Sequence, residues 1–345
     1  MRAKSRKGGG LFVLRPRPPL DFDRTLERYR LWGVDPANVW HDGAFYRLAR
    51  VAGRLVPFRL EASGSPNRPT VRVTFAGADT AAIRATLRRE VGRVLGLEWD
   101  LAGFYARAGA DPVLAPLVRR LYGLRPSVAP DPFEMLVGAI TAQQVNLTFA
   151  FTVRARLVRR FGKPVAFDGV TVYTFPSPAV LAGADVAALR AMQLTTRKAE
   201  FIIGLARDVA EGRLDLAHLA AAPDEAVIAR LTAVRGLGRW TAEWFLARGL
   251  GRPDVCPADD RGVRRAVETL CFRGRAADAA RIRRRACAWR PFRSVAVHYL
   301  LAAMRLDRRP SSWGECVVPT HRAGTRPPTP SPAAGVPPSP ADGPF

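Results

Sequence analysis

The sequence predicts an α+β protein in which a small antiparallel β-sheet with helices precedes a longer region built of helices alone. Three short segments near the start are rich in β-branched and aromatic residues, as strands are, and they cover 45–51, 55–60 and 70–75. In the last segment Val71, Val73 and Phe75 fall on one face, as the two-residue period of a strand requires. From about residue 111 to residue 306 the apolar residues recur instead at helical spacing.

The sheet region extends over residues 20–109, behind a basic segment, residues 1–19, that we expect to be flexible. Helical spacing precedes the strands over residues 23–32 and follows them over residues 81–95. One apolar stripe of the second helix joins Ile83, Leu87, Val91 and Leu95. Because such a stripe has to be buried, we expect helices to back the sheet.

The helical region covers residues 110–306. Its clearest helices are expected over 133–161, 178–193, 197–211, 226–231, 260–270, 276–287 and 292–304. Residues 307–345 are rich in Pro, Ala and Ser and offer few side chains for a core, which predicts a disordered tail.

The composition favours a nucleic-acid partner. Lys and Arg number 54 against 30 Asp and Glu, so the formal net charge is +24, and a surface of this kind attracts polyanions. Almost all of the positive charge belongs to arginine, since the lysines are only Lys4, Lys7, Lys163 and Lys198.

Other features exclude several classes of protein. No apolar run approaches the roughly 20 residues of a membrane span, and the basic N-terminus lacks the apolar core of a secretory signal. The four cysteines match neither a zinc nor an iron–sulfur spacing, and the four histidines form no metalloenzyme pair. We therefore expect a cytoplasmic protein with no membrane partner.

The stretch 233–242, Ala-Val-Arg-Gly-Leu-Gly-Arg-Trp-Thr-Ala, is the first candidate for function. Gly236 and Gly238 lack a Cβ, so their loop can turn sharply and bring peptide N–H groups close to an anion. A helix is expected to leave this loop, and its N-terminus adds unpaired N–H donors and a partial positive charge. Another helix, capped by Asp224, precedes the loop. The alternative is an ordinary turn between two helices with a glycine cap.

An acidic pair, Asp259 and Asp260, lies about twenty residues downstream, at the expected start of the next helix. The positive end of that helix suits an ionised carboxylate, so one of the pair could serve in catalysis. The alternative is that both aspartates only cap the helix.

Residues 235–249 and 254–260 together resemble the helix-hairpin-helix superfamily of DNA base-excision glycosylases, and within it the bacterial 3-methyladenine DNA glycosylase II type. Further likenesses follow in the expected order at 139–145, 195–199 and 289–294. The resemblance covers about residues 20–306. It implies that residues 110–306 form two helical subdomains with the active-site cleft between them. Residues 20–109 then resemble the N-terminal domain that alkylpurine glycosylases add.

Asp260 is the catalytic residue that the resemblance implies, and Asp259 is then left to cap the helix. Cleavage of an N-glycosidic bond builds positive charge on the sugar, which an ionised carboxylate beneath the sugar stabilises. Relatives that also cut the strand carry a lysine nucleophile two positions after the second hairpin glycine, where this sequence has Trp240. The resemblance therefore implies a monofunctional DNA glycosylase, without lyase activity, for base excision repair. It excises alkylated purines of the 3-methyladenine and 7-methylguanine type and leaves an abasic site.

The resemblance also implies which residues contact DNA. Trp240, Trp244 and Phe292 are expected to line a pocket for the flipped base, although aromatic residues at this spacing equally suit a core. Gln144 matches the position that relatives insert into the minor groove, but Gln143 and Gln144 also suit an amide network that caps a helix. Contacts to double-stranded DNA with damaged bases are expected from Arg235, Gly236, Leu237, Gly238, Arg239, Thr241, Gln143 and Gln144.

No cofactor is expected for catalysis. The hairpin resembles those that hold a monovalent cation, Na⁺ or K⁺, with backbone carbonyls, which here belong to Thr232, Val234 and Leu237. The protein is expected to act as a monomer.

Alternative functions remain open. Trp244 and Phe292 stand where relatives often have tyrosine and tryptophan, so the glycosylase could prefer other lesions. A catalytically silent DNA-lesion binding module is the second alternative, but such a module has no need of Asp260. An RNA-binding protein would share the charge, yet no RNA-stacking motif is recognisable.

Overall fold

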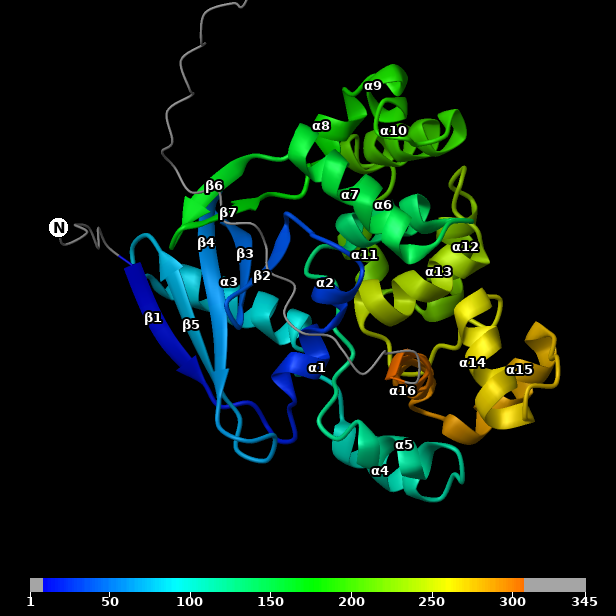
Figure 1. Ribbon diagram of the computed structural model, residues 1–345. Helices are drawn as coiled ribbons and strands as arrows, with labels where there is room; N and C mark the ends of the chain where they lie inside the picture. Colours follow the sequence, from blue (N-terminus) through cyan, green and yellow to red (C-terminus); the bar gives the residue numbers. More distant parts are fainter. Residues whose placement is uncertain (1–8, 307–345) are drawn as a thin grey trace, which may run out of the picture. The chain divides into compact units, whose positions relative to one another are not determined.

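A five-stranded antiparallel sheet, in the order β1-β5-β4-β3-β2, forms the first part of the computed structural model, which describes residues 9–306 (Figure 1). Val71, Val73 and Phe75 are fully buried, so the predicted inner face of the third segment is confirmed. The predictions for residues 1–8 and 307–345 lie outside the described residues. The strands are β1 (Gly9–Leu14), β2 (Asn38–His41), β3 (Ala44–Val51), β4 (Arg54–Ser63) and β5 (Thr70–Ala76).

Strand β1 corrects the prediction of a flexible lead over residues 1–19. It pairs with β5 along its whole length, at the edge of the sheet. Phe12 is buried in the core, whereas Leu11 and Val13 are exposed, so the strand does alternate as a half-buried strand should. Its sequence, Gly-Gly-Leu-Phe-Val-Leu, does not alternate between polar and apolar residues and stands between basic stretches, which is why no strand was predicted here.

Three helices accompany the sheet: α1 (Phe22–Leu26), α2 (Arg28–Leu31) and α3 (Ala81–Val94). Thr80 caps α3 by accepting a hydrogen bond from the peptide N–H of Ile83. Leu87 and Val91 are fully buried in the same cluster as the inner residues of the strands. Helix α3 therefore packs on the sheet, as its apolar stripe predicted.

The buried apolar side chains of the helical region form two clusters. Helices α6 to α13 and the π-helical turn η1 build the first, and α4, α5 and α14 to α16 build the second. Trp244 packs against both clusters, so it lies where they meet. The elements are α4 (Leu101–Gly109), α5 (Leu114–Arg120), α6 (Pro132–Ala142), α7 (Leu147–Phe161), α8 (Pro178–Ala182), α9 (Val186–Arg190), α10 (Thr196–Ala210), α11 (Leu216–Ala221), α12 (Asp224–Thr232), α13 (Arg239–Trp244), η1 (Phe245–Leu250), α14 (Arg261–Phe272), α15 (Ala279–Ala286), η2 (Cys287–Trp289) and α16 (Arg293–Leu306).

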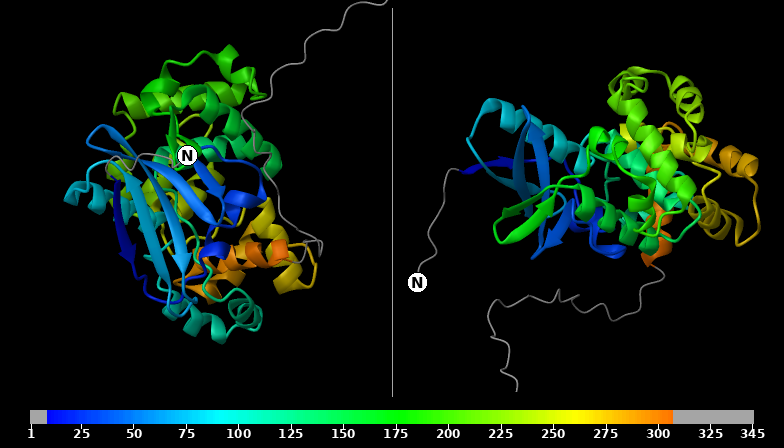
Figure 2. Two further views of the ribbon diagram at one scale, coloured as in Figure 1. Left: turned by 60° about the vertical axis from the view of Figure 1, so that its left-hand side comes forward. Right: turned by 90° about the horizontal axis from the view of Figure 1, so that it is seen from above.

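A hairpin interrupts the region for which helices alone were predicted. Strands β6 (Pro164–Phe167) and β7 (Val170–Tyr173) turn around Asp168 and Gly169, whose φ angles of +49° and +80° suit a tight two-residue turn. The side chains of β7 are buried against those of β3, so the hairpin lies beside the main sheet (Figure 2). The helical region is thereby attached to the sheet region.

Three helix predictions also need correction. The single helix expected over 178–193 is two short helices, α8 and α9, because α8 ends with Gly183 as its C-cap and Asp185 caps α9. The single helix expected over 133–161 is two helices, α6 and α7, because the chain turns at Gln143 and at Gln144, whose φ is +55°. Asp224 is the first residue of α12 rather than its cap, and Pro223 stands at the cap position.

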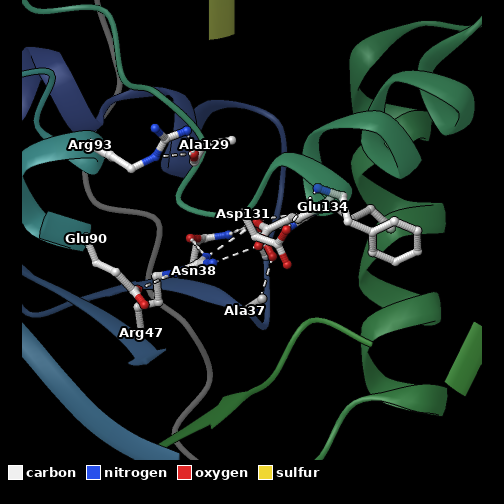
Figure 3. A network of polar contacts seen from close by, with 11 residues as sticks. Ala37, Asn38, Arg47, Glu90, Arg93, Ala129, Asp131 and Glu134 are labelled. Carbon is white, nitrogen blue, oxygen red and sulfur yellow. Dashed lines mark hydrogen bonds and ion pairs between the residues drawn. The ribbon is translucent and has the colours of Figure 1, made fainter. Parts of the chain in front are cut away.

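A buried network of charges joins the sheet to the helices (Figure 3). Arg47 of β3 and Arg154 of α7 both bind the carboxylate of Glu134 on α6, at 2.7 and 2.8 Å. Arg154 also binds Asp35, at 2.9 Å, and Asn38 of β2 donates to Glu134. Burial by itself would raise the pKa of Glu134, but Arg47 and Arg154 lower it to about 2.

His298 on α16 makes the free energy of unfolding depend on pH. Its burial, together with the positive charges of Arg248 and Arg305, lowers the pKa of His298 well below its ordinary value. In the unfolded chain the imidazole of His298 takes up a proton near pH 6.5, whereas in the folded protein it stays neutral at that pH. We expect stability to fall as the pH drops below about 6.5, and His298→Gln to remove this part of the loss. Urea unfolding at pH 7.5 and 5.5 measures it.

The control is the same substitution at the exposed His218 of α11. If His298→Gln and His218→Gln unfold with the same dependence on pH as the native chain, His298 is not the group that titrates.

Candidate active site

The loop between α12 and α13 forms the predicted hairpin. Gly236 adopts φ +91°, and a Cβ at this position would lie 2.2 Å from the ring of Phe201. Both conditions require glycine there. Gly238 stands at the cap position of α13 without a side-chain hydrogen bond, so the first peptide N–H groups of α13 are left for a ligand.

Asp260 lies at the start of α14 and uses its two carboxylate oxygens differently. Oδ1 accepts a hydrogen bond from the peptide N–H of Val263, at 2.8 Å, which caps the helix. Oδ2 accepts hydrogen bonds from the indole N–H groups of Trp240 and Trp244, at 2.7 and 3.1 Å. The prediction that Asp259 caps α14 is therefore wrong. Capping and a chemical role, which the sequence presented as alternatives, can coexist in Asp260.

The three aromatic residues predicted for the base pocket are not equivalent. Trp240 and Trp244 are half-buried and point their indole N–H groups at one oxygen of Asp260. Phe292 precedes α16 and packs in the second cluster, where its ring centroid lies 6.1 Å from that of Phe104. Trp244 packs against the same cluster. The pocket role of all three residues stays a prediction.

An ion-pair network supports the loop that carries Asp260. Glu243 of α13 is buried and accepts from Arg239, at 3.0 Å, and from Arg283 of α15, at 3.4 Å. Arg283 also binds Asp259. Asp259 is therefore bound within this network. The network links α13 and α15 to the residue that precedes Asp260. Arg239 and Glu243 are only four residues apart, but Arg283 lies 40 positions after Glu243, so no local pattern indicated the whole network.

The residues predicted to contact DNA from the hairpin differ in exposure. The side chain of Arg235 is 77% exposed, although it pairs with Glu200 at 3.1 Å. Arg239 is half-exposed and paired with Glu243. Leu237 is buried, and Thr241 is only 1% exposed, so its hydroxyl is not available to DNA.

The loop between α6 and α7 lies against the hairpin. The side-chain amide of Gln143 donates to the carbonyl of Gly236, at 2.9 Å, so Gln143 is a structural link. Gln144 is exposed. Asn146 caps α7 by accepting from the peptide N–H of Phe149. The amide of Gln143 thus bonds the loop between α12 and α13 rather than capping a helix, and Gln144 stays a candidate for insertion into DNA.

Two classes of site find no support between residues 9 and 306. Over that range no three His, Cys, Asp or Glu side chains converge as metal ligands would. Within the same range, none of the helices has both the length and the apolar character that crossing a bilayer demands.

Two family models match the chain. Residues 137–291 match the model described as HhH-GPD superfamily base excision DNA repair protein, and residues 11–131 match the AlkA N-terminal domain. Together they cover both the sheet region and the helices that hold the hairpin and Asp260.

Similar proteins carry related names. The DNA-3-methyladenine glycosylase of Bacillus subtilis (strain 168) is 34% identical over 204 residues, which are 59% of this chain and 67% of that protein. The structure of the 3-methyladenine DNA-glycosylase from Archaeoglobus fulgidus superposes with a TM-score of 0.77 at 29% identity, covering 86% of this chain and 99% of that one. The Schizosaccharomyces pombe 3-methyladenine DNA glycosylase Mag1, in complex with abasic DNA, superposes with a TM-score of 0.52 at 25% identity, covering 59% and 97% of the two chains.

Proposed function

We propose that this chain, which belongs to the HhH-GPD superfamily of base excision DNA repair proteins, is a monofunctional glycosylase. It is a DNA-3-methyladenine glycosylase of the AlkA type and acts in base excision repair of alkylated bases. Its substrates are then purines such as 3-methyladenine and 7-methylguanine, and its product is an abasic site in an uncut strand.

One observation carries the proposal: the second carboxylate oxygen of Asp260 faces two indole N–H groups while the first is fixed by the backbone of α14. Departure of the base leaves positive charge on the sugar, which an ionised carboxylate stabilises as it develops. Because three hydrogen bonds fix the direction of the carboxylate, little rearrangement is needed during the reaction.

The nature of the base explains why a single carboxylate is sufficient. A purine alkylated at N3 or N7 already carries a positive charge, so it leaves without being protonated by an acid. The rings of Trp240 and Trp244 are anchored to Asp260, and electron-rich rings attract a cationic base through their faces. The site therefore favours cationic purines over neutral ones.

The lack of strand cutting follows from the side chain at position 240. A lyase needs an amine that attacks the sugar and forms a Schiff base. Trp240 occupies the position from which related lyases attack. Lys198 of α10 donates to the carbonyls of Thr141 and Gln143, at 3.0 and 2.6 Å.

We infer that the partner is double-stranded DNA, and we propose that a single copy of the chain binds it in the cytoplasm. The free N–H groups at the start of α13 suit a phosphate, and the Schizosaccharomyces pombe relative is bound to abasic DNA. A monovalent cation on the carbonyls of Thr232, Val234 and Leu237 would strengthen this contact. The Val234 carbonyl also accepts the peptide N–H of Leu237, so the turn already has one internal bond there.

The decisive experiment analyses both products after incubation of the protein with methylated duplex DNA. We expect free 3-methyladenine and 7-methylguanine, with strands that stay intact until hot alkali cleaves the abasic sites. Borohydride should trap no covalent complex, because no Schiff base forms. Strand breaks before alkali, or a trapped complex, would show a lyase. Absence of both methylated purines would refute the proposed substrates, and unmethylated duplex is the control.

A further inference from the structure

Lys198 does not point to solvent, although it lies in the first turn of α10. Its Nζ donates to the carbonyl of Thr141, at 3.0 Å, and to that of Gln143, at 2.6 Å. These carbonyls belong to the C-terminal end of α6, where backbone acceptors have no partner within the helix and the dipole favours a cation. Lys198 thus fixes the point at which α6 ends and the loop to Gln144 begins.

The same face of α10 also supports the hairpin. Phe201, three residues after Lys198, has its ring packed where a Cβ of Gly236 would lie. Gln143 completes the arrangement, because its carbonyl accepts from Lys198 while its amide donates to the carbonyl of Gly236. Helix α10 therefore holds two loops at a fixed separation, one that presents Gln144 and one that presents the hairpin.

A lysine at position 198 suits the two carbonyls that its side chain binds. The chain has 54 basic residues, of which four are lysines, so a lysine at this position departs from a strong bias towards arginine. An ammonium group carries three donors that rotate freely, and it can bind two carbonyls that are not coplanar. The planar fork of arginine matches a carboxylate or phosphate better. A helix end with two carbonyls is therefore a position where lysine is preferred.

We propose that Lys198 is a positioning residue for base extrusion, because it fixes the loop of Gln144 relative to the hairpin that holds the DNA backbone. The proposal rests on the proposed function, in which the lesion leaves the stack before its bond is cut. Extrusion requires that the gap be filled while the phosphates are held, so the distance between the two loops matters. The chemistry at Asp260 does not depend on that distance once the base is outside the duplex.

The test separates extrusion from bond cleavage. Lys198→Met keeps the length of the side chain and removes its donors, and Lys163→Met, at an exposed lysine, is the matched control. Extrusion is measured with 2-aminopurine beside a lesion nucleotide whose glycosidic bond resists cleavage, in duplex DNA, where unstacking raises fluorescence. Base release is measured at saturating protein from a paired lesion and from the same lesion in an unpaired bubble, where unstacking costs less.

For Lys198→Met we expect a loss of the fluorescence rise and a fall in release from paired DNA of about 10- to 100-fold, as small misplacements cause. Release from the bubble should stay within about twofold, because Asp260 is untouched. For Lys198→Arg, both the fluorescence rise and the release from paired DNA should lie between those of the native chain and those of Lys198→Met. Lys163→Met should behave as the native chain does.

The proposal fails if Lys198→Met extrudes the base normally, or if release from paired and bubble DNA falls by the same factor. If Lys198→Met does not fold, Gln143→Met, which removes the bond to Gly236 and leaves α6 capped, must show the same selective loss of extrusion. A native protein that releases no methylated purine from either DNA would refute the proposed function. The fluorescence measurement would still decide the role of Lys198.

Discussion

Asp260→Asn should lower the rate of base release by about 10²- to 10³-fold, as loss of a preorganised electrostatic group does at other active sites. Asparagine caps a helix as well as aspartate, so the bond to the peptide N–H of Val263 and the start of α14 should persist. Its amide NH2 group then faces the indole N–H groups of Trp240 and Trp244, which donate to Oδ2 in the native chain. The substitution therefore removes the negative charge together with these two hydrogen bonds. Release of 3-methyladenine under single-turnover conditions measures the effect, and the thermal midpoint of unfolding verifies the fold.

Asp259→Asn is the matched control, because the two carboxylates are adjacent but differently engaged. Asp259 binds Arg283, and its loss should reduce release only severalfold, through a looser support for the loop. If Asp259→Asn abolishes release and Asp260→Asn does not, the assignment of the two aspartates must be exchanged. Equal and complete loss in both variants would indicate that the loop itself had moved.

The sequence was sufficient for features that depend on local periodicity. Val71, Val73 and Phe75 alternate as a strand must, and the apolar stripe of α3 repeats every turn, so both faces were assigned correctly. Gly236 likewise indicated the turn, because its positive φ and the close approach of Phe201 both require glycine. Gly238 has an extended backbone with open space where a Cβ would lie, so its conformation does not require glycine.

Features that depend on residues far apart in the chain could not be predicted from the sequence. Strand β1 is defined by its pairing with β5, more than fifty residues away, and its six residues stand between two basic stretches. The sequence left open whether Asp260 caps the helix or acts in catalysis, and it did not indicate that one oxygen caps α14 while the other accepts from Trp240 and Trp244. Lys198 belonged to a likeness at 195–199, but nothing local indicated which carbonyls it binds.

Glu134→Gln should destabilise the protein by about 3 to 5 kcal/mol, the range found when one partner of a buried ion pair is removed. Glu134 is only 6% exposed, and its carboxylate stands between the guanidinium groups of Arg47 and Arg154. Glutamine keeps the volume but leaves two buried cations without this charge. Asp35 still binds Arg154, and Glu90 lies 3.7 Å from Arg47, so a value near the lower limit is expected.

The dependence on pH distinguishes this loss from a simple packing defect. The folded pKa of Glu134, about 2, is below that of the unfolded chain, so its contribution is present above about pH 4.5 and is lost as the pH falls towards 2. The difference in unfolding free energy between native protein and Glu134→Gln should therefore shrink between pH 6 and pH 3. A packing defect would leave the difference constant.

Glu200→Gln provides the comparison at the surface, where Glu200 binds the largely exposed Arg235. Solvent weakens such a pair, so the substitution should cost less than about 1 kcal/mol. If Glu134→Gln loses no more unfolding free energy than Glu200→Gln does, water reaches the charges around Glu134. A large loss at Glu134 that persists at pH 3 would mean that shape, rather than charge, joins α6 to β3. The sheet region is fixed to the catalytic helices by charge only if the loss is both large and dependent on pH.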